Sequence, residues 1–123
     1  MTSVSDNELL VLKCIWTAGR ALSVSEIISM LKENFGKECK HTTVCTFLTR
    51  LKKKKCVDFT AQGKSYLYFP LVSENDYLKN EMKTFKQFWF DNSISSLVEA
   101  FCALDKISEK EVQALKNFVN TLD

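Results

Sequence analysis

The chain has 123 residues, a hydrophobic fraction of 46% and a formal net charge of +2. This hydrophobic content excludes a disordered chain, and three Gly and one Pro argue against a loop-rich or repeat architecture. No apolar run approaches the ~18 residues of a membrane span. Asp6 and Glu8 stand where a signal peptide would be basic and then apolar. We therefore expect a cytoplasmic protein of one or two small domains, without membrane insertion.

Basic residues gather in the middle of the chain. Residues 37–64 carry a net charge of +6, whereas residues 1–36 carry −1 and residues 65–123 carry −3. Part of this charge is a run of four lysines at residues 52–55. A basic segment between acidic flanks predicts a localised anion-binding surface, although a lysine run by itself is also typical of a solvated helix end.

Apolar residues at helical spacing predict three helices in the first half of the chain. The first covers residues 8–16 and is followed by Gly19, a natural helix stop. The second starts after Ser23, which has the spacing of a capping box with Glu26, and it ends at Gly36. The third covers residues 41–54, and its inward side chains are Val44, Phe47, Leu48 and Leu51.

A β-hairpin is predicted next. Residues 57–60 and 65–69 are β-prone, and the turn between them, residues 61–64, contains Gly63. An isolated hairpin is only marginally stable, so we expect it to pack on the helices. Three helices followed by a hairpin predict a mainly α fold, with a winged helix-turn-helix domain over residues 1–72.

The third helix of such a domain enters the major groove of DNA, and the hairpin tip can reach a phosphate or the minor groove. Threonine can bond a base edge or touch a thymine methyl, and lysine suits phosphate. The predicted DNA-binding residues are Thr42, Thr43, Thr46, Thr49, Arg50, Lys52, Lys53, Lys55 and Lys64. The alternative is that the threonines are merely solvated and that Arg50 forms a salt bridge within the fold.

Residues 73–123 form a second predicted region with a different character. Ser73, Ser93 and Ser108 each precede an apolar helix, and three short helices have little interior of their own. Burial against a second copy of the chain solves this problem, and a two-fold dimer suits a palindromic DNA site. The predicted dimerisation residues are Leu78, Met82, Phe85, Phe88, Trp89, Leu97, Val98, Phe101, Val112, Leu115, Phe118 and Val119.

The five cysteines lack the C-x-x-C spacing of a metal site, and the chain has a single histidine. Most cysteines are therefore expected to act as small hydrophobic residues, without a metal or other cofactor. Enzymatic activity is not expected, because His41 has no acid or nucleophile partner at a recognisable spacing. A thiol- or metal-responsive regulator stays open as an alternative, since Cys39, Cys45 and Cys56 lie in or beside the predicted DNA-binding region.

Four segments resemble the BlaI/MecI family of penicillinase and methicillin-resistance repressors. They are Glu8–Trp16, Thr43–Leu51, Tyr66–Val72 and Ser95–Phe101. The similarity extends over essentially the whole chain. The third-helix motif together with the Trp16 segment is fairly specific, and the C-terminal part is looser.

The resemblance implies a homodimeric repressor that binds inverted-repeat operators of β-lactam-resistance genes through an N-terminal winged helix. It also implies a membrane sensor metalloprotease as a partner. Family members are cleaved in the dimerisation region before a phenylalanine that matches Phe101, which places the cleavage at Ala100–Phe101. Cleavage would break the dimer, so the two half-sites would no longer be held by one molecule.

The chain departs from the family pattern at several positions. Ala100 replaces the usual Asn before the cleaved bond, Lys55 replaces Gly after the third helix, and Lys40-His41 replaces Ser-Pro before it. A left-handed backbone at Lys55 would cost about 1 kcal/mol relative to glycine. The Cys-rich tail of the copper-responsive branch of the family has no match in this chain, which argues against copper sensing.

Three functional classes are thus considered. They are a DNA-binding repressor, a thiol- or metal-responsive regulator, and a winged-helix protein adapter that never binds DNA.

Overall fold

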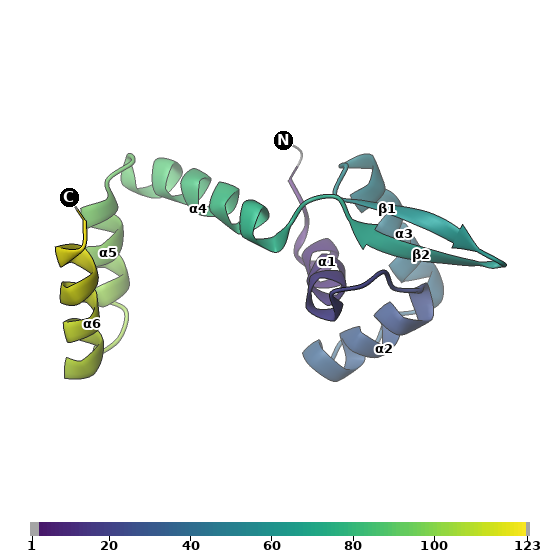
Figure 1. The fold of residues 1–123 in the computed structure, drawn as a ribbon, viewed down its shortest axis with the longest axis horizontal. Helices are drawn as coiled ribbons and strands as arrows, with labels where there is room; N and C mark the ends of the chain where they lie inside the picture. The colour runs from purple at the N-terminus through teal and green to yellow at the C-terminus, as the bar shows by residue number, and fades with distance from the viewer. Residues whose placement is uncertain (1–2, 123) are drawn as a thin grey trace. The chain divides into compact units, whose positions relative to one another are not determined.

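The computed structural model describes residues 3–122 of the chain. The chain divides into two compact units, Met1–Leu78 and Lys79–Asp123, and the boundary falls inside a helix, α4 (Glu74–Phe90). Figure 1 shows the order of the elements along the chain. None of the helices in the described residues is long and apolar enough to cross a membrane.

Three helices form the body of the first unit, α1 (Asp6–Ala18), α2 (Val24–Phe35) and α3 (His41–Lys53). Ser23 and Glu26 make the predicted capping box at the start of α2. Both α1 and α2 end at a glycine with a left-handed backbone, Gly19 at φ +66° and Gly36 at φ +63°. The predicted starts and stops of these helices are thus confirmed within a few residues.

One apolar core lies between these helices and the hairpin. On α3, the predicted inward residues Val44, Leu48 and Leu51 are buried, and Phe47 packs against the edge of the core. Burying a large aliphatic side chain contributes roughly 1.5–3 kcal/mol, so this contact fixes which face of α3 remains outside. The buried apolar residues are Val11, Leu12, Cys14, Ile15, Leu22, Ile27, Leu31, Val44, Leu48, Leu51, Cys56 and Val57.

The hairpin consists of β1 (Val57–Gln62) and β2 (Ser65–Pro70), paired antiparallel. Its strands are longer than predicted, because Gln62 pairs with Ser65 and leaves only residues 63–64 in the turn. The predicted four-residue turn is therefore wrong. Gly63 has φ +60° at the first central position, where a two-residue type II′ turn takes glycine.

Backbone hydrogen bonds attach the hairpin to the helices, as its marginal stability alone requires. Leu22, in the loop before α2, exchanges two hydrogen bonds with Tyr68 of β2, at 2.9 and 2.8 Å. On the face of the hairpin that also carries buried Val57, the Phe59 ring contacts Tyr66 and Tyr68, with centroids 4.6 and 5.5 Å apart. The hairpin is therefore attached through Tyr68 to the loop before α2.

The first unit continues beyond the hairpin into α4. The Trp16 indole N–H donates to the carbonyl of Val72 at 2.9 Å, and its ring lies 5.5 Å from that of Tyr77. Lys13 forms an ion pair with Glu74. The start of α4 is therefore anchored on α1.

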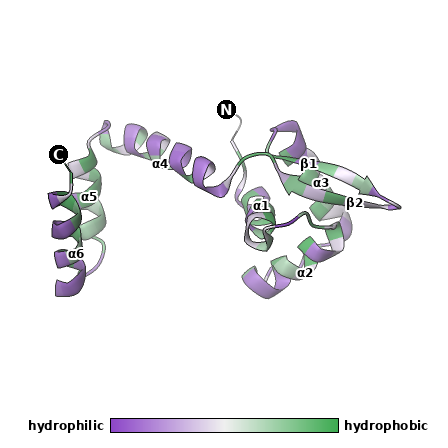
Figure 2. Cartoon of the chain, in the orientation of Figure 1, coloured by the Kyte–Doolittle hydropathy of each residue, from purple (hydrophilic) through white to green (hydrophobic). Residues whose placement is uncertain are grey.

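The second unit contains the rest of α4 with α5 (Ile94–Cys102) and α6 (Glu109–Asn120). Ser73, Ser93 and Ser108 each accept a backbone N–H, so the predicted helix starts are confirmed. No described residue of α4, α5 or α6 is buried, although Figure 2 shows α5 as a mostly hydrophobic helix.

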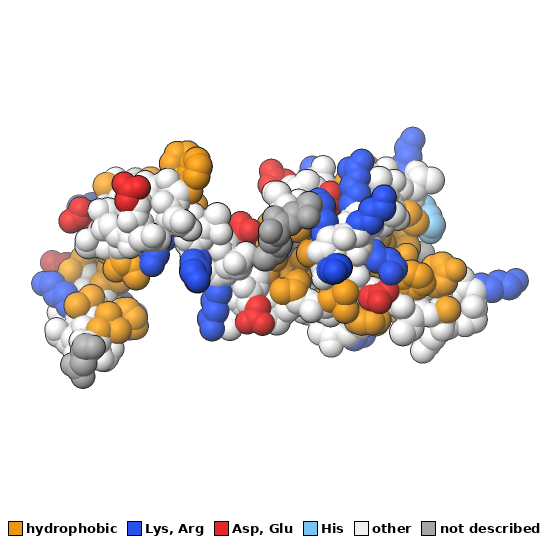
Figure 3. All heavy atoms as spheres, turned by 90° about the horizontal axis from the view of Figure 1, so that it is seen from above, with side chains coloured by type: hydrophobic (Ala, Val, Ile, Leu, Met, Phe, Trp, Pro, Cys, Tyr) orange, Lys and Arg blue, Asp and Glu red, His pale blue; other side chains and the backbone are white. Residues whose placement is uncertain are grey.

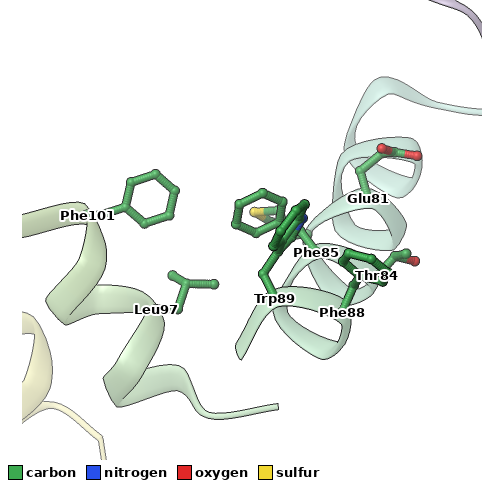
Figure 4. Close-up of a pocket in the computed structure, with 8 residues that line it drawn as sticks. Glu81, Thr84, Phe85, Phe88, Trp89, Leu97 and Phe101 are labelled. Atoms are coloured by element: carbon green, nitrogen blue, oxygen red, sulfur yellow. The ribbon is translucent and has the colours of Figure 1, made fainter. Parts of the chain in front are cut away.

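The exposed apolar side chains of this unit border an open hollow of about 490 Å³ (Figure 4). Phe88 and Trp89 are 72% and 65% exposed, which is unusual for large aromatic residues of a soluble protein. The hollow is lined by Glu81, Met82, Thr84, Phe85, Phe88, Trp89, Leu97 and Phe101. In the single chain, α4, α5 and α6 therefore expose apolar side chains of the kind that a protein core buries.

Candidate nucleic-acid interface

The outer face of α3 is polar and open to solvent. Residues that are three, four or seven positions apart share a helix face, so the burial of Val44, Leu48 and Leu51 turns the threonines outward. The exposed predicted site residues on α3 are Thr42, Thr43, Thr46, Thr49, Arg50, Lys52 and Lys53. Thr42, Thr46, Thr49 and Lys53 follow one another along the middle of this face.

Two threonine hydroxyls on this face are already hydrogen-bonded within the helix. Thr46 donates to the carbonyl of Thr42 at 3.0 Å, and Thr49 donates to the carbonyl of Cys45 at 2.9 Å. Such bonds to the preceding turn are common for threonine in helices. Each hydroxyl keeps acceptor capacity, and it must break its internal bond before it can donate to another group.

The four lysines of residues 52–55 make different contacts. Lys52 forms an ion pair with Asp58 at 3.3 Å and lies 5.6 Å from the centre of the Phe59 ring, so it leans over the hairpin. The pKa of Asp58 is lowered, first by the backbone N–H of Phe59 and then by Lys52. In the described residues, Lys53, Lys55 and Lys64 are exposed and form no ion pair.

Lys54 points inward, which the sequence pattern did not predict. Its ammonium forms an ion pair with Glu8, whose side chain is only 2% exposed, and that of Lys54 is 17% exposed. Burial raises the pKa of Glu8, but the hydrogen bonds from Lys54 and Ser5 outweigh burial and leave the pKa below its ordinary value. This pair joins the end of α3 to the start of α1.

Lys55 has the left-handed backbone that its position after α3 suggested, with φ +62°. Replacing Lys55 by Gly is expected to raise the free energy of unfolding by about 1 kcal/mol, because glycine adopts this conformation without strain. Urea unfolding of Lys55→Gly and Lys55→Ala isolates the backbone effect, since both variants lose the same ammonium group. Equal stability of the two variants would show that the strain is absent.

Arg50 forms no ion pair in the described part of the chain, so the alternative of an internal salt bridge finds no support. Arg20, by contrast, is engaged by Glu26 at the start of α2 and holds the pKa of that carboxyl at about 2. Figure 3 shows Lys and Arg side chains gathered over one face of the first unit. The free cations on α3 and the hairpin can therefore meet an anion without first losing an internal partner.

The three cysteines of the thiol-responsive alternative, Cys39, Cys45 and Cys56, differ in burial. Cys56 is buried, and burial raises the pKa of its thiol, which disfavours it as a reactive group. Cys39 and Cys45 are half-buried. No group of three or more metal-ligating side chains comes together in residues 3–122.

Three packed helices, a paired hairpin and an exposed polar face on the third helix define a winged helix-turn-helix protein. The profile of the family described as penicillinase repressor matches residues 4–121, so the chain belongs to the penicillinase repressor family. This confirms the family that the sequence segments suggested.

Individual relatives agree with this assignment. The penicillinase repressor of Bacillus licheniformis is 30% identical over 112 residues, which are 91% of this chain and 85% of that protein. The methicillin resistance regulatory protein MecI of Staphylococcus aureus strain N315 is 30% identical over 95% of this chain and 93% of its own length. The solved DNA binding domain of the repressor BlaI is 31% identical, covering 63% of this chain and 94% of that chain with a TM-score of 0.50.

Proposed function

We propose that the protein is a DNA-binding transcriptional repressor of the β-lactam-resistance type, acting in the cytoplasm as a homodimer on a palindromic operator. The observation that carries this proposal is the exposed threonine and basic face of α3, next to a hairpin with Lys64 at its tip. The names of its relatives support it, since they are a penicillinase repressor, a methicillin resistance regulator and a DNA binding domain of a repressor.

In this proposal α3 lies in the major groove and the hairpin lies along the DNA backbone. Thr43 and Thr46 read base edges or thymine methyl groups, because their short side chains project from the exposed face of the helix. Lys53, Lys55 and Lys64 meet phosphates, and the same role for Lys52 requires it to leave Asp58.

Alanine substitutions are expected to separate phosphate contacts from base contacts. Lys53→Ala and Lys64→Ala should weaken binding to every duplex sequence, and each should reduce the slope of log K against log salt by about 1. Thr43→Ala and Thr46→Ala should instead change sequence preference, by about 1–3 kcal/mol at the contacted base pair. Fluorescence anisotropy at several salt concentrations, with selection from a random duplex library, measures both effects.

Lys32→Ala provides the matched control, because Lys32 is an exposed lysine near the end of α2 that pairs with Glu38 at 3.3 Å. We expect it to leave the affinity and the salt slope unchanged. Binding that is independent of salt would favour a protein adapter over a repressor. Sequence preference that survives both threonine changes would instead contradict the assignment of the base-reading face.

Dimerisation is assigned to residues 73–123, and DNA binding to residues 1–72. The support is the apolar surface of α4–α6, in which Phe88, Trp89 and Phe101 are at least half exposed in the single chain. A second copy of the chain could cover this surface with the same apolar residues, and apolar contacts of this kind are typical of homodimer interfaces.

Release of the operator is proposed to follow cleavage at Ala100–Phe101 by a membrane sensor metalloprotease. Both residues lie in α5, and the Phe101 side chain is 54% exposed, with its ring 6.4 Å from that of Phe85 (Figure 4). A protease binds extended backbone, so α5 must unwind locally before the bond is cut. Cleavage would separate α6 and the last residues of α5 from the rest of the chain.

A further inference from the structure

A second hollow lies beside the proposed recognition helix, within the first unit. It has a volume of about 400 Å³, in the range of small-molecule sites. The start of α2, the first turns of α3 and the hairpin border it. Its lining residues are Ser23, Val24, Ser25, His41, Cys45, Lys64, Ser65, Tyr66 and Tyr68.

A thiol and an imidazole face each other at this hollow. The Cys45 sulfur lies 3.5 Å from His41 Nδ1, one helical turn away, and Cys45 is half-buried. A histidine within hydrogen-bond distance of a cysteine can accept the thiol proton as the sulfur attacks a carbon centre.

The other thiols have different surroundings. Burial raises the pKa of Cys14 to about 11 and also raises that of Cys56, so both are poor nucleophiles at neutral pH. Cys39 and Cys102 are half-buried, as Cys45 is, and neither has a histidine at hydrogen-bond distance within residues 3–122. Cys45 is thus the thiol that combines access, a neighbouring base and a hollow that can hold a reactant.

We propose that Cys45 and His41 form a modification site for small α,β-unsaturated carbonyl compounds, and that the adduct lowers the affinity of the protein for DNA. This regulatory part rests on the proposed repressor function, whereas the reactivity of Cys45 does not. It gives the chain a second route of release that needs no proteolysis.

The reaction is an addition that balances without an oxidant or a reductant. The thiol proton passes to His41 Nδ1, and the Cys45 sulfur forms a bond to the β-carbon of the electrophile. The π electrons of the C=C bond move toward the carbonyl as an enolate. The imidazolium then returns the proton to the α-carbon, which leaves a thioether on Cys45 and a neutral His41.

The adduct would interfere with DNA because of where the hollow lies. Cys45 lies about one turn after Thr42 and about one turn before Thr49 on α3, and the Thr49 hydroxyl donates to the Cys45 carbonyl. Lys64, at the hairpin tip, lines the same hollow. An added group would fill the space between the helix and the hairpin, where proposed base and phosphate contacts must be made together.

Methyl vinyl ketone is a suitable probe, used on the full-length chain. Peptide mapping by mass spectrometry is expected to show Cys45 modified about 10- to 100-fold faster than Cys39 and Cys102. His41→Gln should reduce the rate at Cys45 to that of Cys39, without changing the rate at Cys39. Equal rates at the accessible thiols, or no effect of His41→Gln, would overturn the reactive pair.

DNA binding of the modified protein tests the regulatory step. The wild-type adduct should bind duplex at least about tenfold more weakly, whereas Cys45→Ala should bind normally both with and without the probe. Full affinity of a stoichiometric Cys45 adduct would overturn the switch but leave the repressor proposal intact. If the unmodified chain shows no salt-dependent binding to DNA, both the repressor proposal and the regulatory effect of the adduct fail. The modification rates of Cys45 and Cys39 still test whether Cys45 and His41 form a reactive pair.

Discussion

A chain that ends after Leu78 is expected to bind a two-half-site operator roughly 10²–10⁴-fold more weakly than the full chain, and a single half-site equally well. The loss corresponds to about 3–5.5 kcal/mol. The physical reason is that a dimer turns the second half-site contact into an intramolecular step, and no individual DNA contact changes.

The end point of the truncation matters. Ending the chain after the hairpin would remove Val72, which accepts the Trp16 indole N–H, and Glu74, which pairs with Lys13. Ending it after Leu78 keeps these contacts, because the first compact unit extends to that residue. A loss of half-site binding in the Leu78 variant would therefore point to a DNA contact from the second unit.

A chain that ends after Ala100 imitates the proposed cleavage product. It lacks Phe101, whose ring lies beside Phe85, and all of α6. We expect it to sediment as a monomer and to resemble the Leu78 variant on both operators. A stable dimer of this fragment would contradict release by cleavage at Ala100–Phe101.

Point variants test the same surface in the full chain. Phe88→Glu places a charge on a side chain that is 72% exposed and borders the apolar hollow, so we expect it to weaken the dimer about tenfold or more. Gln87→Glu adds the same charge one residue earlier and should have little effect. Sedimentation velocity over a concentration series compares the two, and equal behaviour would remove Phe88 from the interface.

The helices could be predicted because their signals are local. Ser23 and Glu26 cap α2 across three residues, and Gly36 ends it immediately after the last turn. The turn of the hairpin was predicted less well, since its length depends on how far the strands pair. Pairing continues to Gln62 and Ser65, which their side chains do not reveal.

Contacts between distant segments could not be predicted from local patterns. Leu22 pairs with Tyr68 of the hairpin, although no strand was predicted at Leu22. Within the candidate site, the spacing of the threonines predicted their common face. The internal hydrogen bonds of Thr46 and Thr49 depend on the side-chain rotamer, so only the structure reveals them.

Lys54→Met is expected to lower the free energy of unfolding by roughly 3 kcal/mol, the largest effect on stability that we expect from one lysine. The ammonium of Lys54 is the charged partner of Glu8, which is 2% exposed. Removing it leaves a buried carboxylate without its counter-charge. Thermal unfolding should show a midpoint lower by roughly 10–25 °C for a domain of this size.

Neighbouring variants separate this effect from a general loss of charge. Lys53→Met makes the same change at an exposed lysine of α3 and should alter stability by about 0.5 kcal/mol or less. Glu8→Gln combined with Lys54→Met removes both charges and should recover most of the lost stability. A double variant as unstable as Lys54→Met alone would show that packing of the lysine chain, rather than its charge, is what matters.

The pH dependence gives an independent test of the Glu8–Lys54 pair. In the wild type the pKa of Glu8 is lowered, so its contribution to stability is full above the unfolded pKa and is lost as the pH falls through the folded value. Without Lys54, its hydrogen bond and its charge no longer lower the pKa of Glu8, so this pKa should lie above that in the wild type. The deficit of Lys54→Met should therefore be largest near neutral pH and should narrow as the pH falls into the acidic range and Glu8 takes up a proton.

The same pair of variants links the fold to the function. At a temperature at which both are folded, Lys53→Met should weaken DNA binding, since its ammonium is free to meet a phosphate. Lys54→Met should retain the salt slope of the wild type, because its ammonium is held by Glu8 and does not contact DNA. Lys53 would then contact DNA, whereas Lys54 would hold α3 in place through its ion pair with Glu8. A reduced salt slope in Lys54→Met would contradict this division.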